Sequence, residues 1–218
     1  MQAACASPVQ RLETVVFYLV LFAGTALIVW ESRDYFLPDR IHGFMLERLN
    51  LAAEDWWRYA LLAHVASGLI CLVSSLLQYS KLLLKHAPSI HRNLGRIYAL
   101  SIVMAVFPTG VALAFVAKGG LSGTIGFITL SFATLFSLIF GMVAIYRKNL
   151  RSHQAWISRS FALVTTAITF RTLQIVLLQF PLAYDFVYQF SLWASIGINL
   201  ALCEYYLLKT SNTKKEKP

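Results

Sequence analysis

The chain has 218 residues, of which 58% are hydrophobic and 13% charged, whereas soluble domains average about half and about a quarter. This composition excludes an ordinary soluble domain and indicates a membrane protein. The formal net charge of +9 does not predict nucleic-acid binding, because the basic residues are distributed as expected for short loops beside a bilayer.

Six apolar windows are long enough to cross a membrane as helices. About 20 residues, rising about 1.5 Å each, cover the roughly 30 Å of hydrocarbon. We predict spanning helices over residues 14–30, 57–77, 93–116, 122–146, 156–180 and 184–208. Because the connections are short, we expect antiparallel neighbours in one all-α, six-helix membrane bundle. This single domain would comprise residues 1–218, with its core in helices two to five.

Basic residues are concentrated on one side of the predicted bundle. Twelve lysines and arginines share the side of the amino terminus: Arg11, Lys81, Lys85, Arg92, Arg96, Arg147, Lys148, Arg151, Lys209, Lys214, Lys215 and Lys217. Since short basic loops stay cytoplasmic, we predict an inner-membrane protein with both termini inside and a solvated basic tail over residues 209–218. No small-residue cleavage site follows the first span, so we expect it to remain as an anchor.

The segment between the first two spans, residues 31–56, has a helical apolar pattern. One face would carry Ile41, Met45, Leu49, Ala52 and Trp56. This spacing predicts a short interfacial helix on the outer surface, which could form a lid.

Small and polar residues form a stripe along the second span. Its members are His64, Ser67, Gly68, Cys71, Ser74, Ser75 and Gln78, and similar stripes in spans four and six contain Ala133, Ser137 and Gly141 and then Ser191, Ser195, Asn199 and Cys203. Such stripes usually mark helix-packing surfaces in membranes. His64 and Gln78 are more polar than packing requires.

Arg171 lies deep in the fifth span, within FRTLQIVLL. An arginine at this depth is costly and should face the bundle interior or water. His64 is at a similar predicted depth, so an intramembrane polar site containing His64, Arg171 and Gln78 is one interpretation, and a structural polar contact is the other. Glu204 has the depth to pair with Arg159.

Two related stretches open the third and fifth spans: HRNLGRIYAL at residues 91–100 and HQAWISRSFAL at residues 153–163. We expect His91 and His153 at the cytoplasmic starts of their helices, behind N-caps such as Ser89 or Ser152. Helix starts attract anions, and Arg92, Arg96, Arg151 and Arg159 would strengthen this attraction. The doubled motif therefore predicts a cationic rim at one membrane face.

Three interpretations of this rim remain open. The first is a b-type heme site. Positive surroundings favour neutral imidazoles, which is the form that ligates iron, so His91 and His153 could be its axial ligands. Gly95 leaves a flat gap one turn beyond His91, and the heme would be surrounded by Arg92, Arg96 and Arg159. A phospholipid headgroup site has the same chemistry. The third interpretation is cytoplasmic positive charge with interfacial histidines and no ligand.

Together, these motifs resemble an uncharacterised family of predicted multi-pass bacterial membrane proteins, domain of unknown function 2306. The family pattern runs over most of residues 57–180: a helix-two histidine with a closing Gln-aromatic pair, then His-Arg-x-x-Gly-Arg-x-Tyr, then His-Arg-x-Trp-Met-x-Arg-Ser-aromatic-Ala-Leu. Gln154 and Ile157 depart from it.

A more distant similarity is to transmembrane b-type cytochromes. It implies one heme between helices three and five, which fits His91 and His153. A second heme would need a histidine on helix four, which has none, so His64 lacks a mate unless His42 substitutes.

Three functions are compatible with the sequence. The first is a membrane redox protein that binds one b-type heme and is surrounded by membrane lipids. It would exchange electrons with quinone near His64 and Arg171 or with another membrane redox subunit. The second is a small-molecule or lipid transporter with the Arg171 and His64 site at its centre. The third is a non-catalytic scaffold subunit. No soluble-enzyme motif is present.

Overall fold

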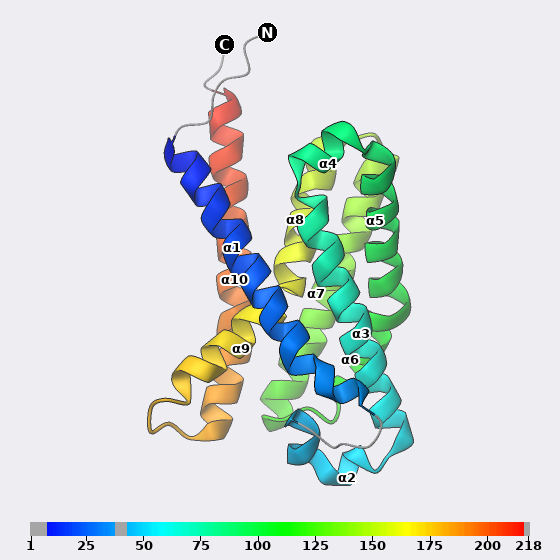
Figure 1. Ribbon diagram of the computed structural model, residues 1–218, viewed down its shortest axis with the longest axis vertical. Coiled ribbons are helices and arrows are strands. Elements are labelled where there is room, and N and C mark those ends of the chain that lie inside the picture. Colours follow the sequence, from blue (N-terminus) through cyan, green and yellow to red (C-terminus); the bar gives the residue numbers. More distant parts are fainter. Residues whose placement is uncertain (1–7, 38–42, 216–218) are drawn as a thin grey trace.

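The computed structural model describes the backbone of residues 8–37 and 43–215 (Figure 1). All regular elements in these ranges are helical. In chain order they are α1 (Pro8–Ser32), η1 (Arg33–Phe36), η2 (Gly43–Arg48), α2 (Leu49–Ala52), α3 (Asp55–Gln78), α4 (Lys81–His86), α5 (Pro88–Ser101), η3 (Ile102–Val106), α6 (Phe107–Ala114), α7 (Gly120–Tyr146), α8 (Leu150–Val164), α9 (Thr166–Leu177) and α10 (Tyr184–Lys215).

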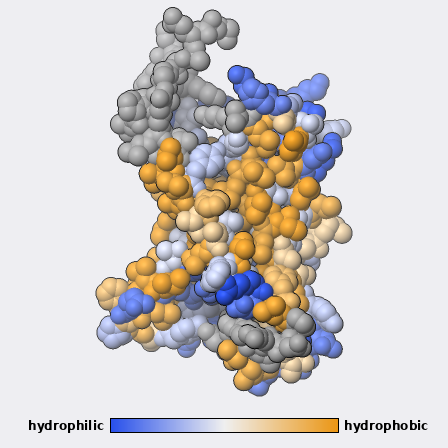
Figure 2. All heavy atoms as spheres, viewed as in Figure 1, coloured by the Kyte–Doolittle hydropathy of each residue, from blue (hydrophilic) through white to orange (hydrophobic). Residues whose placement is uncertain are grey.

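Six helical stretches in the described residues are long and apolar enough to cross a membrane, which confirms the predicted all-α fold class. They cover Val15–Phe36, Asp55–Gln78, Pro88–Ala114, Gly120–Tyr146, Leu150–Leu177 and Tyr184–Thr210. The third and fifth begin at Pro88 and Leu150, five or six residues earlier than predicted, because the basic first turns are already helical. Figure 2 shows hydrophobic residues over the middle of the visible face and hydrophilic residues toward its two ends.

The helices form two groups (Figure 1). The groups are joined where α10 packs against α8 and where α1 crosses between α3 and α9. One group contains α3, α5 with α6, α7 and α8, and its closest neighbours are the antiparallel pairs α3–α5 and α7–α8. On the other side, α9 packs on α10. The start of α1 and the end of α10 lie at one end of the molecule, called here the terminal end; α2 lies at the opposite, loop end.

Burial supports the interpretation of the small-residue stripes as packing surfaces. Ser67, Cys71, Ser74 and Ser75 of α3 are buried, as are Ser137 and Gly141 of α7 and Ser191, Ser195 and Asn199 of α10. A Cβ atom added to Gly141 would lie 2.7 Å from the Ile157 side chain. The glycine therefore allows α7 and α8 to approach closely.

The third span is interrupted by a π-helical turn, Ile102–Val106, which ends two residues before Pro108. Proline has no backbone N–H, so the helix cannot keep its regular hydrogen bonds through this position. The backbone N–H of Phe107 instead donates to the Ile102 carbonyl, one residue further back than in an α-helix.

The fifth span is broken at Thr165, between α8 and α9, in a segment without proline or glycine. The Ala162 carbonyl accepts bonds from three side chains: Thr165 Oγ1 at 2.9 Å, Thr166 Oγ1 at 3.4 Å and Asn199 Nδ2 at 3.0 Å. These donors satisfy a carbonyl that must otherwise be paired within the membrane. After the break, α9 runs beside α10 (Figure 1).

At the loop end, the structure differs from the predicted single amphipathic helix. Two short helical segments, η2 and α2, replace it, because Arg48, the last residue of η2 and the N-cap of α2, has non-helical backbone angles. Met45 and Trp57 are buried in one cluster with Leu61, whereas Leu49 and Trp56 are exposed. Ile41 and His42 lie outside the described residues. The segment therefore covers the ends of α3 and α6 through Met45.

Candidate functional site

His91 and His153 lie in the first turns of α5 and α8, at the terminal end. Their imidazoles are close enough to interact electrostatically. The N-caps differ from the predicted serines: the Asn149 side chain accepts the Ser152 N–H at 3.0 Å, and α5 begins at Pro88 without a side-chain cap. Pro88 suits this start because a first-turn N–H has no partner within the helix.

The two imidazoles differ in their hydrogen bonds. His153 Nδ1 lies 2.8 Å from the Gly141 carbonyl oxygen. A carbonyl only accepts, so Nδ1 carries the proton and, in the neutral ring, Nε2 carries the lone pair. His91 Nδ1 is buried without a hydrogen-bond partner in the described part of the chain. Each ring therefore keeps a nitrogen that a ligand could engage.

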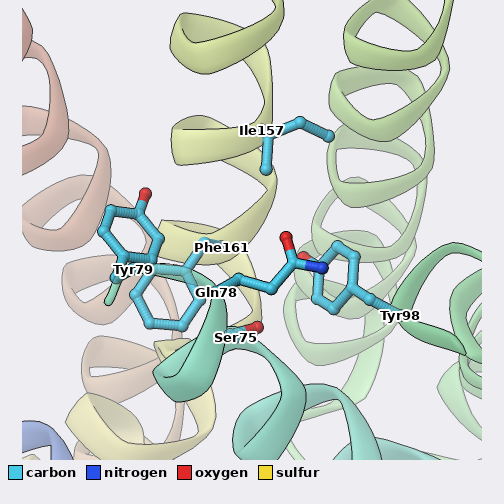
Figure 3. A pocket seen from close by; sticks show the side chains of 6 residues that line it. All are labelled: Ser75, Gln78, Tyr79, Tyr98, Ile157 and Phe161. Atoms are coloured by element: carbon cyan, nitrogen blue, oxygen red, sulfur yellow. The ribbon is translucent and has the colours of Figure 1, made fainter. Parts of the chain in front are cut away.

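Gln78 fills the gap that the sequence predicted beside Gly95. Its amide Nε2 donates to the His91 carbonyl at 3.4 Å, and a Cβ atom added to Gly95 would lie 2.8 Å from the same nitrogen. In Figure 3 the Gln78 side chain reaches from α3 toward Tyr98 of α5.

A cavity of about 10 Å³ lies beside Gln78, which is room for about one water molecule. It is lined by Ser75, Gln78, Tyr79, Tyr98, Ile157 and Phe161 (Figure 3). The Gln78 side chain occupies the gap beside Gly95 that a porphyrin would need. In the described ranges, no three side chains of histidine, cysteine, aspartate or glutamate group as metal ligands.

The predicted pairing of Arg159 with Glu204 is confirmed. Arg159 Nε and Nη2 donate to the two carboxylate oxygens at 2.5 and 3.0 Å, and the guanidinium also lies 4.7 Å from the centre of the Trp156 ring. Such a bidentate pair fixes both groups. Arg159 therefore joins α8 to α10, and its charge is already compensated.

The other basic residues form an exposed surface at the terminal end. Arg92 is exposed, and Arg96 Nη1 donates to the nearby Asn93 side chain at 3.3 Å. Further exposed cations on α4 and around the α7–α8 turn are Lys85, Arg147, Lys148 and Arg151. We call these six residues the basic rim; Figure 2 shows hydrophilic residues at this end of the visible face.

Below the histidines, Tyr98 and Ser160 join α5 to α8. Their hydroxyls are 2.9 Å apart and both side chains are buried. Each residue follows its histidine by seven positions. The equal spacing in the two related motifs was the signal that could have identified this contact from the sequence.

Tyr79, just beyond the end of α3, anchors α1 to the four-helix group. Its carbonyl accepts the Tyr18 hydroxyl at 2.7 Å, and its ring packs on Phe161. Burial raises the pKa of the Tyr79 hydroxyl, which lies near Ser158. The side chain is therefore neutral at physiological pH.

His64 faces the interruption of the third span. Its Nδ1 lies 3.0 Å from Thr109 Oγ1, and that hydroxyl donates to the Ala105 carbonyl at 2.5 Å. Because the single hydroxyl proton is already used, His64 Nδ1 is the donor in the first bond. A Cβ atom added to Gly110 would lie 3.0 Å from Ser131 Oγ and 3.2 Å from the His64 ring. Residues of α3, α6 and α7 therefore meet at this point.

Arg171 does not join His64 in the described structure. Its Nη1 donates to Gln174 on the same helix at 3.4 Å, and its guanidinium lies 5.9 Å from the centre of the Phe170 ring. The predicted proximity assumed a continuous fifth span, whereas the break at Thr165 directs α9 toward α10. Gln78 is also separate from both residues, since it lies at the terminal end with His91.

The fold and these sites define a multi-pass α-helical membrane protein. The family model "Predicted membrane protein (DUF2306)" matches residues 61–207, and the chain belongs to this family. The match includes both histidine motifs, the two interruptions and Glu204. No curated protein and no solved structure matches significantly, so the similarity to b-type cytochromes receives no support from these comparisons.

Proposed function

We propose that this protein is a secondary transporter for a small solute. The observation that supports it most is the interruption of two spans at corresponding positions. The π-turn begins at Ile102, eleven residues after His91, and the break lies at Thr165, twelve residues after His153. Discontinuous spans in corresponding positions of related halves are typical of transporter binding sites.

The interruption of the third span offers suitable groups for binding a solute. His64, Thr109 and Ser131 come from three different helices, and His64 Nε2 remains as an acceptor in the neutral ring. A polar solute could replace the internal bond between His64 and Thr109 with bonds to itself. The basic rim would favour anionic solutes at the terminal end.

Water access to Ser131 tests this proposal without knowledge of the substrate. Alternating access exposes a central site to each side in turn. In a variant with Cys5, Cys71 and Cys203 replaced by serine, we expect Ser131→Cys to react with a membrane-impermeant thiosulfonate from both sides of sealed vesicles. Thr129→Cys is the matched control: it is two residues away on α7 but exposed on the outer surface of the bundle, so it should not react. Labelling of Ser131→Cys from neither side would contradict the proposal.

We propose heme-dependent electron transfer as the second candidate, because His153 keeps a free Nε2 and His91 keeps an unpaired, buried Nδ1 within electrostatic reach. Binding would require Gln78 to leave its position beside Gly95. An absorption spectrum of protein purified from heme-replete cells tests this candidate. A Soret band that disappears in His91→Ala and His153→Ala supports it, and a colourless folded protein excludes it. Failure of both tests would favour a scaffold subunit.

A further inference from the structure

His64 is a titratable side chain near the middle of the membrane. It lies nine residues after Asp55, the first residue of α3, which is about 14 Å along a helix that must cross about 30 Å of hydrocarbon. The elements around it, η3, α6 and α7, contain no charged residue, and their one titratable side chain, Tyr146, lies at the far end of α7. Ionisable side chains at such a depth typically belong to ion or proton pathways.

The surroundings of the His64 ring are electrically neutral. On its own helix the nearest charged residue is Arg58, six residues earlier toward the loop end, and the nearer Tyr59 is exposed. In the described part of the chain, no charged side chain interacts electrostatically with the ring. An imidazolium here would therefore have no counter-charge within the protein, and an isolated charge away from water is strongly disfavoured. We expect the ring to be neutral while the site holds no anion.

The hydrogen bonds of the ring leave one nitrogen that can take up a proton. Nδ1 donates to Thr109 Oγ1 at 3.0 Å, because that hydroxyl uses its own proton on the Ala105 carbonyl. In the neutral ring Nε2 therefore has a lone pair. Protonation of Nε2 keeps the bond to Thr109 and adds a second donor, and the Val106 carbonyl also interacts favourably with the protonated ring. These oxygens orient an imidazolium, but they do not cancel its charge.

A bound anion would supply the missing charge. An anion alone in this neutral region is disfavoured for the same reason as an imidazolium alone, whereas the two together form a neutral pair. The binding of a proton and the binding of an anion are therefore coupled, and each increases the affinity for the other. Because one histidine compensates one negative charge, the anion is monovalent.

The positions of the donors favour a carboxylate over a spherical anion. A Cβ atom added to Gly110 would lie 3.0 Å from Ser131 Oγ and 3.2 Å from His64 Cε1, the ring atom between the two nitrogens. The His64 ring of α3 and the Ser131 hydroxyl of α7 thus face the same point from two sides. Two such donors match the two oxygens of a carboxylate. Since the helices are closely packed at Gly110, the carboxylate must belong to a small molecule.

From these observations, we propose that the site at His64 binds a small monocarboxylate together with one proton, which is held on Nε2. This proposal rests on the transporter function proposed above, to which it adds the class of solute and the coupling ion. The proton comes from water on the side where the anion enters and returns to water with the anion on the other side. No net charge crosses the membrane, and His64 is unchanged after a cycle. The basic rim attracts the anion at the terminal end.

Proton uptake on anion binding tests the proposal. Purified protein in a weakly buffered detergent solution is mixed with formate, acetate, lactate or pyruvate at matched pH, and a pH indicator records the protons taken up. We expect at least one of these salts to cause uptake of one proton per bound carboxylate. Its affinity should rise about tenfold when the pH falls by about one unit, because the coupling is reciprocal.

Two variants and one control connect the uptake to this site. His64→Gln keeps an amide donor but cannot take up the proton, so uptake should be lost and any remaining affinity should not depend on pH. Ser131→Ala should weaken carboxylate binding about tenfold but still take up one proton per bound anion. His86→Gln is the matched control, since His86 is exposed at the end of α4, and it should behave like the wild type. Thermal unfolding checks that each variant is folded.

Chloride in place of the carboxylates tests the kind of anion and should cause no uptake. No uptake with any of the four carboxylates, equal uptake with chloride, or unchanged uptake in His64→Gln would overturn the proposal. Its failure is distinguishable from that of the transporter proposal. Labelling of Ser131→Cys from both sides, with no proton uptake by the wild type, keeps the transporter and removes the proton and carboxylate. Uptake with labelling from neither side indicates a binding site that does not transport.

Discussion

The Arg159–Glu204 pair is the main ionic contact between α8 and α10 in the described structure. The carboxylate accepts two charge-assisted bonds, although its side chain is 45% exposed. Glu204→Gln keeps the shape but removes the charge. We expect it to lower the free energy of unfolding in detergent by about 1 kcal/mol, because partial exposure weakens the pair.

Glu31→Gln provides the matched control for this measurement. Glu31 is exposed on α1, so the same chemical change should leave the unfolding midpoint unchanged. A similar loss of stability in both variants would mean that the Arg159–Glu204 pair has no specific role.

At the scale of residues, the sequence predicted those contacts that depend mainly on how deep each residue lies in the membrane. Arg159 and Glu204 lie near the same end of neighbouring spans, and this was enough to predict their pair. The role of Gln78 was not predictable in this way. Whether its amide or a ligand fills the space beside Gly95 depends on the distance between α3 and α5, which no local pattern encodes.

At the scale of elements, Asn199 stabilises the break between α8 and α9. Its amide donates to the Ala162 carbonyl at 3.0 Å and to Thr165 Oγ1 at 3.3 Å, while its carbonyl accepts the Thr169 hydroxyl at 2.8 Å. We expect Asn199→Ala to lower stability by about 1–2 kcal/mol, since these buried partners lose their bonds. Thermal unfolding in detergent measures the effect.

Ser195→Ala is the appropriate comparison for Asn199→Ala. Ser195 lies one turn earlier on α10 and is fully buried, but its hydroxyl donates only to the Leu192 carbonyl of its own helix. Its removal should therefore change stability by less than about 0.5 kcal/mol. Equal effects in the two variants would argue against a special role of Asn199.

The six membrane-spanning helices were predictable from the lengths of the apolar stretches in the sequence. The interruptions within two of these helices were not. A proline such as Pro108 weakens a helix, but it does not specify that a π-turn forms before it. The break at Thr165 had no local signal, because its stabilising donor, Asn199, lies more than thirty residues away. The polar contact of Arg171 with Gln174 lies on α9, beyond this break.

At the scale of the whole molecule, α1 begins and α10 ends at the same face, the terminal end (Figure 1). The basic rim also lies at this face. We propose that this face is cytoplasmic in an inner membrane, since lysine and arginine in short loops are retained there. A fluorescent protein fused after residue 218 should fluoresce, and alkaline phosphatase fused after Lys118 should be active. The reverse pattern would show the opposite orientation.

The break in the fifth span also has a consequence for the flexibility of the bundle. No proline prevents residues 150–177 from forming one continuous rod, so the bent shape depends on the side-chain bonds at the break, worth about 1 kcal/mol each, and on the packing of α9 against α10. Straightening would move Arg171 and Gln174 together with α9 and reorient α9 relative to α10. The fifth span can therefore act as a joint whose motion requires no loss of secondary structure.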